Sequence, residues 1–391
     1  MIKVSVVGVR GLNYEGGIES YCRYLYPEIA ALGYQVTIYT RRRYEEGAKY
    51  GHIKIKTTRS IEILGMETLS HTIFALAGMA FHGRPDVVHF QAIGPALFAP
   101  LARFLGCAVV VRHVGNDWER QKWGWLGRTV LRLAERSVAR FADVVVCLND
   151  EAAAAFRTRW PESGEVNVIQ NAVPRTAAKF GRSAVDRYAL TPGRYVLAVS
   201  RLTPEKGLDV LMDAFTKSGL AEQGWRLAIA GRIGRRNTYT RALAAQAVRT
   251  KGAVLLGEFP STALAELFAH AGMFASASFH EGMSFSILEA LSHGLPCIVT
   301  DISANAIPCR GYATLVPPGD ADALGAMLML AAQNPMTDNA KVAQRAMIAR
   351  FHDLQIAAQA TAAALTRSVE LASARRDRTS RSAAPKHRAP N

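Results

Sequence analysis

Apolar and polar residues follow one another along the chain in a pattern that predicts strands and helices in alternation. Residues 2–7 form an apolar run that ends in a glycine-rich loop. From residue 18 to residue 32 the apolar positions recur about every 3.6 residues, as in a helix, and Gly33 ends the segment. Apolar runs return at residues 35–40, 86–90, 108–111 and 143–148. This alternation predicts a parallel sheet with helices on both faces.

The same pattern begins again near residue 195. Strand-like runs cover residues 195–199, 226–230, 253–256, 273–276 and 297–300, and helical segments cover 208–215, 262–269 and 285–293. We therefore predict an α/β fold of two Rossmann-like, doubly wound parallel-sheet domains that face a central cleft. Their predicted limits are residues 1–180 and 181–345. We expect a helix at 346–372 to pack back towards the first domain, and residues 373–391 to form a basic disordered tail.

Composition adds little to this picture, because 49% apolar and 20% charged residues are close to the averages of globular proteins. The five cysteines are scattered and include no C-x-x-C pair, so we expect a reducing, cytosolic compartment and neither disulfides nor a metal site. The chain opens on a strand, and no run of about 18 apolar residues occurs in it. We therefore expect neither a signal peptide nor a membrane-spanning helix.

The charge balance points to an anionic partner. The 47 Lys and Arg residues exceed the 32 Asp and Glu residues, which gives a net charge of +15. Such an excess indicates nucleic acid, anionic lipid or a phosphorylated substrate. The sequence contains no RNA-recognition, KH, zinc-finger or helix-turn-helix signature. We therefore expect no nucleic-acid partner, and we keep a nucleic-acid or anionic-surface binding protein as the alternative function.

Two glutamates stand out in residues 280–289, HEGMSFSILE, which follow a predicted strand and open a predicted helix. Ser284 would be the N-cap of this helix, and the backbone N–H groups of residues 283–286 would face an anion there. A diphosphate at this point, with Glu289 on ribose hydroxyls and Glu281 facing a reacting sugar, would give each residue a role. The alternative is that both glutamates are ordinary surface charges.

Two cations, Arg201 and Lys206, follow the first strand of the second predicted domain in the loop SRLTPEKG. Both would emerge over the carboxyl edge of that sheet, where ligands of open α/β sheets bind. Because Arg forks onto phosphate oxygens and Lys acts as a point charge, the pair suits a diphosphate. The alternative is a pair of solvated surface charges. We expect Lys206 and Glu281 to lie at a solvent-accessible cleft.

The first loop, residues 8–19, contains the adjacent Gly16 and Gly17 but neither the G-x-G-x-x-G order of a dinucleotide site nor a Walker pattern. Two glycines at a helix start would let the backbone approach a substrate. Adjacent glycines also occur in turns whose role is only structural.

Taken together, these motifs resemble the retaining, GT-B fold glycosyltransferases of family four. In that family a Gly-Gly turn in the N-terminal domain, an Arg and a Lys after the first C-terminal strand, and a Glu-x7-Glu element occur in this order. The matching residues here are Gly16 and Gly17, Arg201 and Lys206, and Glu281 and Glu289. The resemblance covers about residues 1–365.

A narrower resemblance links residues 11–19 and 115–124 to bacterial rhamnosyltransferase-like enzymes that build surface polysaccharide. That subgroup carries His-Gly-x-Glu/Asp-Trp, whereas here Val114 precedes Gly115 and the histidine is His113. One step along a strand turns a side chain to the opposite face. His113 is therefore either the subgroup's catalytic-site histidine, if the strand bulges, or a hydrogen-bonded core residue.

The resemblance implies transfer of a sugar, with retention at the anomeric carbon, from a nucleotide diphosphate sugar to an acceptor hydroxyl. The donor would be dTDP-rhamnose or GDP-mannose, bound by the second domain, and the first domain would bind a lipid-linked saccharide of exopolysaccharide or lipopolysaccharide assembly. The family needs no cofactor and no bound metal. The implied catalytic residues are Glu281, Arg201, Lys206 and His113, and the implied donor contacts are Gly16, Gly17, Gly231, Gly282, Met283, Ser284, Phe285, Ser286 and Glu289. A GT-B sugar-nucleotide epimerase is the alternative enzyme.

A basic stripe predicts a membrane or acceptor contact. Its arginines recur at every fourth position of a predicted helix, and tryptophans lie just before and at its start: Arg128, Arg132, Arg136, Arg140, Trp118, Trp123 and Trp125. Arginine stems and tryptophan rings suit an anionic interface. We predict peripheral attachment to the inner face of the cell membrane through this stripe and the basic tail. The alternative is a solvated helix face with the tryptophans in the core.

Overall fold

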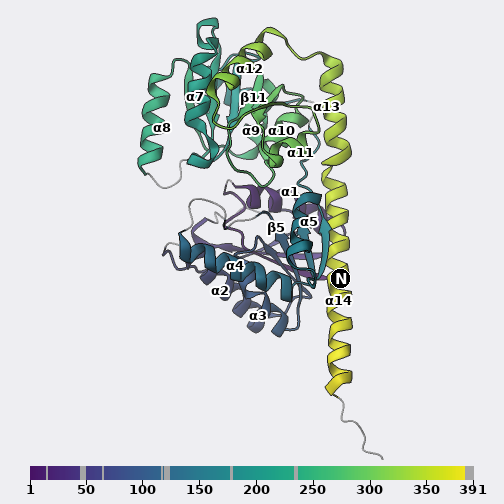
Figure 1. Cartoon of the computed structure of the whole chain (residues 1–391). Helices are drawn as coiled ribbons and strands as arrows, with labels where there is room; N and C mark the ends of the chain where they lie inside the picture. The colour runs from purple at the N-terminus through teal and green to yellow at the C-terminus, as the bar shows by residue number, and fades with distance from the viewer. Residues whose placement is uncertain are drawn as a thin grey trace, which may run out of the picture. The chain divides into compact units, whose positions relative to one another are not determined.

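Two parallel sheets carry the fold (Figure 1). The computed structural model describes residues 1–14, 16–44, 50–63, 66–115, 118, 124–176, 179–232 and 237–383. By its internal contacts the chain divides into two compact units. The first holds Met1–Tyr14, Cys22–Gln170 and the chain from Gln355 onward. The second holds Asn171–Leu354 together with the start of the first helix, up to Tyr21.

Within the described residues, the first unit contains a seven-stranded sheet in the order β3-β2-β1-β4-β5-β6-β7. Every pairing in it is parallel. Its strands are β1 (Lys3–Val7), β2 (Gln35–Arg41), β3 (Lys54–Thr58), β4 (Val87–Gln91), β5 (Ala108–His113), β6 (Val144–Cys147) and β7 (Glu165–Val168). Strands β4 and β5 are buried along their whole length, as expected where helices cover both faces of a sheet.

Helices lie on both faces of this sheet. They are α1 (Gly17–Ala31), α2 (Met66–His82), α3 (Ala99–Phe104), α4 (Trp125–Phe141), α5 (Asp150–Arg159) and α14 (Leu354–Ala383), with short 3-10 turns η1 (Arg42–Tyr44) and η2 (Pro95–Phe98). Phe90 of β4 packs in one core with Met79 of α2 and Val138 of α4. The neighbouring His89 lies 2.8 Å, Nδ1 to hydroxyl, from Tyr26 of α1. Because successive strand residues point to opposite faces, α2 and α4 cover one face and α1 the other.

The second unit contains a six-stranded sheet, counted over the described residues, in the order β10-β9-β8-β11-β12-β13. Its pairings are also parallel. The strands are β8 (Tyr195–Val199), β9 (Arg226–Ala230), β10 (Ala253–Gly257), β11 (Met273–Ser276), β12 (Cys297–Thr300) and β13 (Thr314–Val316). The predicted α/β fold with two Rossmann-like parallel sheets is confirmed.

The helices of the second unit pack around this sheet. They are α6 (Ser183–Arg187), α7 (Leu208–Lys217), α8 (Thr238–Arg249), α9 (Ser261–His270), α10 (Phe285–Ser292), α11 (Ser303–Cys309), α12 (Ala321–Gln333) and α13 (Asp338–Phe351), with 3-10 turns η4 (Pro204–Lys206) and η5 (Leu220–Gln223). The apolar side of α7 supplies Leu211, Met212 and Phe215, which are fully buried against Ile229 of β9 and Leu328 of α12 in one core.

The chain enters and leaves the second unit through two segments that pair with each other. Val173 and Asp353 form a parallel β-bridge, and the Val173 N–H donates to the His352 carbonyl at 3.1 Å. The buried His352 ring lies between the carbonyl oxygens of Asn171 (2.9 Å from Nδ1) and Pro308 (3.2 Å from Nε2). Burial lowers the pKa of His352, so this ring is neutral at pH 7.

Edge strands and the C-terminus depart from the sequence predictions. The pattern does not predict β3, β7 and β13, which are short edge strands with at most two apolar residues each. The prediction of a disordered tail from residue 373 is wrong as far as Ala383, because helix α14 continues to that residue. Arg375 forms an ion pair with the buried Asp143, and Arg376 donates to the Gly106 carbonyl at 3.0 Å. These contacts order Arg375 and Arg376. The local sequence does not predict this order, because Asp143 and Gly106 lie far away along the chain. Residues 384–391 lie outside the described residues.

Two observations concern the environment of the chain. Among the described residues, no helix has both the length and the apolar character needed to cross a bilayer. The five cysteines are buried free thiols. Burial raises the pKa of Cys107 to about 11 and that of Cys147 to about 12, so these thiols stay protonated and unreactive near neutral pH.

Candidate functional site

Three loops meet at the carboxyl edge of the six-stranded sheet. The loop after β8 pairs with the end of β9 through Ser200 N–H and the Ala230 carbonyl, 3.0 Å apart. It pairs with the loop after β11 through Phe279 N–H and the Glu205 carbonyl, 2.9 Å apart. Because parallel strands all end at the same edge, residues far apart in sequence are brought to one place, where ligands of such sheets bind.

Two glycines allow these loops to approach so closely. Gly231, a predicted donor contact, has φ +148°, and an added Cβ would lie 1.8 Å from the Ser200 carbonyl oxygen. Gly207 has φ +57°, and its Cβ would lie 2.2 Å from the Ala277 carbonyl oxygen. A side chain at either position would force the loops after β8, β9 and β11 apart.

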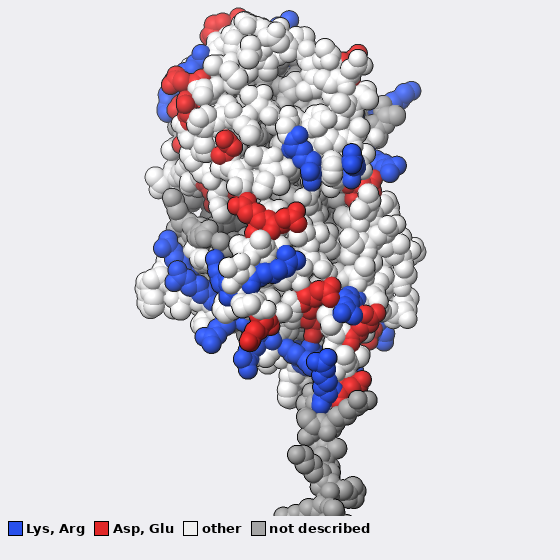
Figure 2. Space-filling model, turned by 45° about the vertical axis from the view of Figure 1, so that its right-hand side comes forward, with Lys and Arg blue, Asp and Glu red and all other residues white. Residues whose placement is uncertain are grey.

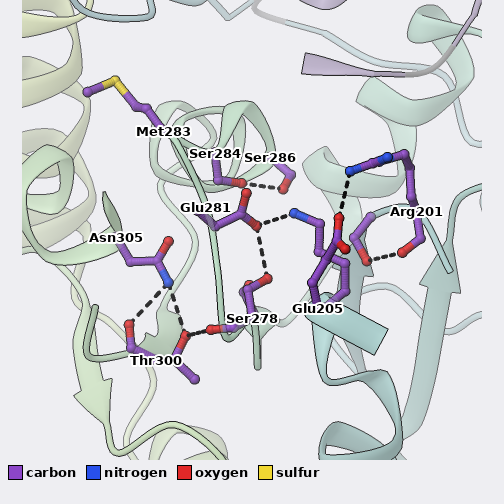
Figure 3. A network of polar contacts seen from close by, with 12 residues as sticks. Arg201, Glu205, Ser278, Glu281, Met283, Ser284, Ser286, Thr300 and Asn305 are labelled. Atoms are coloured by element: carbon purple, nitrogen blue, oxygen red, sulfur yellow. Dashed lines mark hydrogen bonds and ion pairs between the residues drawn. The ribbon is translucent and has the colours of Figure 1, made fainter. Parts of the chain in front are cut away.

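An ion pair joins the loop after β8 to the loop after β11 (Figure 3). Lys206 Nζ lies 2.5 Å from Glu281 Oε1, and the Ser278 hydroxyl donates to the same oxygen at 2.9 Å. Both charged side chains are only 11% exposed. They are thus more buried than the predicted position at a solvent-accessible cleft suggests.

The electrostatics of this pair keep Glu281 ionised. Burial by itself would raise the pKa of the Glu281 carboxyl, but the Lys206 ammonium, the Ser278 hydroxyl and, more weakly, the Arg201 guanidinium outweigh it. The resulting pKa of Glu281 lies below its ordinary value of 4.5. At neutral pH the site therefore holds a fixed carboxylate next to two cations.

Arg201 lies beside this pair and is more exposed. Its Nη2 is 3.0 Å from Glu205 Oε1, one turn further along the chain, and its side chain is 34% exposed (Figure 3). Glu205 thus holds one edge of the guanidinium. The sequence predicted Arg201, Lys206 and Glu281 as site residues, and the structure brings all three together.

A polar network behind Glu281 was not predicted. The Thr300 hydroxyl donates to the Ser278 carbonyl at 2.6 Å, and Asn305 Nδ2 donates to both the Thr300 carbonyl and its hydroxyl oxygen at 3.1 Å. These three side chains are at most 1% exposed (Figure 3). Ser, Thr and Asn are common in loops and helix starts, so no local signal in the sequence sets these residues apart.

The start of α10 is arranged differently from a simple N-cap. Ser284 occupies the N-cap position, as predicted, but its hydroxyl lies 3.0 Å from that of Ser286 and does not cap the backbone. Met283 and Phe285 are buried, and Asn171 Nδ2 donates to the Met283 carbonyl at 2.8 Å. Gly282 is half-buried between Glu281 and this turn. Asn171 thus holds the backbone of this turn through the Met283 carbonyl, and no side chain caps the first N–H groups of α10.

The remaining predicted donor contacts lie at helix positions. Glu289 is half-buried in the second turn of α10. Gly16 and Gly17 lie at the start of α1, in the segment that groups with the second unit. An added Cβ at the exposed Gly17 would meet nothing within 4 Å, so this helix start has open space around it.

His113 lies in the core of the first unit. Its side chain is 3% exposed, with Nε2 3.5 Å from Glu135 Oε1 and the ring edge-on to Phe156 at 5.3 Å between centroids. Strand β5 keeps a regular register with both neighbours, so it has no bulge to turn His113 to the other face. The core placement agrees with the core alternative, but neither ring nitrogen has a hydrogen-bond partner among the described residues, so the predicted hydrogen bond is not seen. A catalytic role for His113 stays a prediction.

The basic stripe and its tryptophans separate in the structure. The side chains of Arg128, Arg132, Arg136 and Arg140 are all exposed along α4. Trp118 is only 7% exposed and lies under the Arg159 guanidinium, so its predicted contact with a membrane or acceptor is wrong. Trp123 lies outside the described residues. Trp125, at the start of α4, is 79% exposed.

Two family models match the chain, one in each half. A model described as glycosyl transferase 4-like domain matches residues 16–172. A model described as glycosyl transferases group 1 matches residues 193–334, which include the loops with Arg201, Lys206 and Glu281. The chain belongs to the glycosyltransferases.

Relatives of this glycosyltransferase include mannosyltransferases. The GDP-mannose-dependent alpha-(1-6)-phosphatidylinositol monomannoside mannosyltransferase of Mycolicibacterium smegmatis is 26% identical over 304 residues, 72% of this chain and 76% of that protein. The GDP-mannose:cellobiosyl-diphosphopolyprenol alpha-mannosyltransferase of Komagataeibacter xylinus is 26% identical over 168 residues, 43% of this chain and 40% of that protein.

Solved structures share the fold of this glycosyltransferase. Anabaena HepE in complex with UDP and glucose has a TM-score of 0.73 and 17% identity, covering 94% of this chain and 100% of that chain. WaaG, a glycosyltransferase involved in lipopolysaccharide biosynthesis, has a TM-score of 0.72 and 16% identity, covering 93% of this chain and 100% of that chain. At these identities the likeness shows the GT-B fold alone.

Gly231→Ala is expected to destabilise this glycosyltransferase by at least about 3 kcal/mol, because the added methyl adds a backbone clash to the strain of the positive φ. Urea unfolding measures the loss. Gly224→Ala is the matched control: its φ is +79°, but an added Cβ meets nothing within 4 Å, so only about 1 kcal/mol of strain is expected. Equal losses in the two variants would contradict the close-approach explanation.

Lys206→Met is expected to destabilise the protein by about 3 kcal/mol at pH 7, because it leaves the Glu281 carboxylate nearly buried without its cation. A carboxyl group whose pKa is lowered by folding stabilises the protein at pH values above its ordinary pKa. This stabilisation is lost as the pH falls through the lowered pKa. The loss in the variant should therefore shrink when unfolding is measured near pH 4.

Lys217→Met is the control for this measurement. Lys217 pairs with Asp322 at 2.7 Å, but the two side chains are 48% and 80% exposed, so a loss below about 1 kcal/mol is expected. A Lys206→Met loss as small as this control, or one that is equally large at pH 4 and pH 7, would count against the buried-pair interpretation.

Proposed function

We propose that this protein is a retaining glycosyltransferase that moves a sugar from a nucleotide diphosphate sugar to an acceptor hydroxyl. The observation that carries the proposal is the grouping of Arg201, Lys206 and Glu281 at the carboxyl edge of the second sheet. The start of α10, with no side-chain cap on its N–H groups, adds a third source of positive potential for the diphosphate. The two cations and the start of α10 together fit a leaving group that carries negative charge.

The proposed step breaks the bond between the anomeric carbon and the β-phosphate oxygen while the acceptor oxygen bonds to the same face of that carbon. The acceptor proton passes to the departing phosphate oxygen, so no protein nucleophile is required. Negative charge grows on the diphosphate in the transition state, where Arg201 and Lys206 stabilise it most. Lys206 has three N–H donors, and Glu281 takes one, which leaves two for phosphate oxygens.

Glu281 has two roles in this proposal. Its carboxylate fixes the direction of the Lys206 ammonium, and its second oxygen faces the positive charge that develops on the transferred sugar. We propose that Arg201, Lys206 and the α10 N-terminus neutralise the diphosphate without a divalent cation. Glu289, in the next turn of α10, is assigned to the ribose hydroxyls of the donor.

For the donor, we propose a GDP- or dTDP-linked sugar. GDP-mannose is supported by the names of the mannosyltransferase relatives. dTDP-rhamnose is supported by the resemblance of residues 11–19 and 115–124 to rhamnosyltransferase-like enzymes. Gly231, directly after β9, is assigned to a donor contact at the carboxyl edge of this sheet.

For the acceptor, we propose a lipid-linked saccharide of polysaccharide assembly, bound by the first unit at the cytoplasmic face of the membrane. The exposed arginines of α4 support this location. A basic residue near an anionic membrane surface contributes about 1 kcal/mol to binding. Four such residues would concentrate the enzyme where a lipid-linked acceptor is found.

The purified protein tests this function with GDP-mannose, dTDP-rhamnose and UDP-glucose, each with and without a polyprenyl-diphosphate-linked saccharide. We expect release of the nucleoside diphosphate with one donor, dependent on the acceptor, unchanged by a metal chelator, and with retained configuration in the product by NMR. Conversion of a sugar nucleotide into its epimer without an acceptor would overturn the proposal in favour of the epimerase. No reaction with any donor would also count against it.

Glu281→Gln and Lys206→Met are each expected to lower turnover at least about a hundredfold, the size of effect seen when a charge contact to the transition state is lost. Turnover is measured under conditions in which circular dichroism shows each variant folded. Lys217→Met should keep normal turnover, since its ion pair lies on the exposed surface of the same unit. Near-normal turnover in a folded Lys206→Met or Glu281→Gln variant removes that residue from the mechanism.

Glu289→Gln is expected to raise the KM for the donor more than it lowers kcat, because a ribose contact is made equally in ground and transition states. Initial rates over a range of donor concentrations separate the two parameters. An unchanged KM with a collapsed kcat would mean that the roles of Glu281 and Glu289 are exchanged.

A further inference from the structure

Asn171 is a buried residue of the segment by which the chain enters the second unit, and it is 2% exposed. Its Nδ2 donates to the Met283 carbonyl at 2.8 Å, and its backbone N–H donates to the Met283 sulfur at 3.3 Å. Met283 is itself only 6% exposed, and Figure 3 shows its side chain directed away from Glu281. Asn171 thus contacts both the main chain and the side chain of a residue that lies 112 positions further along the chain.

The contact with the Met283 carbonyl fixes the orientation of one peptide group. The peptide between Met283 and Ser284 is planar and trans, so its C=O and its N–H point in opposite directions. Because Asn171 holds the carbonyl, the Ser284 N–H points away from Asn171. Among the described residues no group accepts a hydrogen bond from this N–H. The N-cap residue of α10 therefore presents an oriented donor three residues after Glu281.

His352 in turn holds Asn171. Its ring is buried, with Nδ1 2.9 Å from the Asn171 carbonyl oxygen and Nε2 3.2 Å from the Pro308 carbonyl oxygen. A neutral imidazole carries a single N–H, so it donates to one of these two oxygens. The shorter distance places the N–H on Nδ1. His352 therefore donates to Asn171, which donates to Met283.

Burial makes these contacts specific. Charged side chains are spread over the surface of the molecule, where water can satisfy them in many orientations (Figure 2). Asn171 and His352 are 2% and 1% exposed, so their polar atoms depend on partners within the protein. A buried donor or acceptor that loses its partner is strongly disfavoured, which keeps the amide and the ring in one orientation each.

We propose that Asn171 is a positioning residue for the donor diphosphate: it directs the Ser284 N–H, and His352 keeps Asn171 in place. The proposal rests on the proposed function and adds to it a residue outside the three loops that meet at the carboxyl edge of the sheet. Phosphate oxygens accept hydrogen bonds from backbone N–H groups at the start of a helix. A peptide whose plane is already fixed loses little freedom when such a group binds, so the contact costs less entropy.

Asn171→Leu tests the proposal, because it replaces the amide by an apolar group of similar size. The KM for the donor should rise about tenfold, the effect of losing one hydrogen bond to a charged group. Inhibition of transfer by the product nucleoside diphosphate should weaken by the same factor. Inhibition by the corresponding nucleoside should not change, since it carries no phosphate. Initial rates at varied donor and inhibitor concentrations give these constants.

Gln344→Met is the matched control. Gln344 is fully buried, and its Nε2 donates to the Leu295 carbonyl at 2.9 Å, beyond the other end of α10. Loss of this bond should lower the melting temperature about as much as Asn171→Leu does, but it should leave the donor KM unchanged. An equal rise in KM in both variants would overturn the positioning role and leave Asn171 a structural residue.

Two variants of His352 test the other contact of Asn171, and they decide the matter if Asn171→Leu does not fold. In His352→Asn the amide nitrogen takes the place of Nδ1, and in His352→Gln it takes the place of Nε2. His352→Asn should therefore keep the donor KM of the wild type, whereas His352→Gln loses the bond to Asn171 and should raise the KM. The reverse order, or equal KM values in the two variants, would overturn the proposal.

The same measurements separate this proposal from the proposed function. If the wild type transfers no sugar from GDP-mannose, dTDP-rhamnose or UDP-glucose, the proposed function fails and the role of Asn171 falls with it. If the wild type is active and a folded Asn171→Leu variant has the wild-type donor KM, the positioning role alone is overturned. Weaker inhibition by the nucleoside as well as by the nucleoside diphosphate would also overturn it, because the defect would then not concern the phosphates.

Discussion

The pairing of Lys206 with Glu281 is the interaction on which the rest of the site depends. It joins two loops that lie 75 residues apart in the sequence, at a depth where either charge alone would be strongly destabilised. Ser278 binds the same carboxylate oxygen, and Thr300 and Asn305 hold Ser278 from behind. These contacts fix the positions of both charges. In the proposed transfer, charges fixed in this way need no rearrangement when the transition state forms.

Much of the fold and part of the site follow from the sequence, because they rest on patterns that are local or strictly periodic. Buried strands with long apolar runs predict both sheets, and the rule that parallel strands end at one edge predicts that Arg201, Lys206 and Glu281 come together. The depth of the pair could not be predicted, since it depends on how closely Gly231 and Gly207 let neighbouring loops approach. That approach is a property of the assembled sheet.

Other errors have the same origin in contacts between distant residues. Trp118 is buried because Arg159, from α5, covers its ring. The basic stretch after residue 372 is helical as far as Ala383, and Arg375 there finds the buried carboxylate of Asp143. Arg159 and Asp143 both lie far along the chain from the residues they contact, Trp118 and Arg375. The sequence near Trp118 and Arg375 therefore does not reveal these contacts. The regular register of β5, which keeps His113 in the core, is likewise set by its neighbouring strands.

The paired segments at Val173 and Asp353 have a consequence for the architecture. Since the chain enters and leaves residues 171–354 side by side, this part of the second unit is an insertion whose two ends are paired through their backbone. When the two ends of an insertion lie next to each other, closing the surrounding chain around it costs little loop-closure entropy. The second unit can therefore change in length with little effect on the first unit, which helix α14 completes.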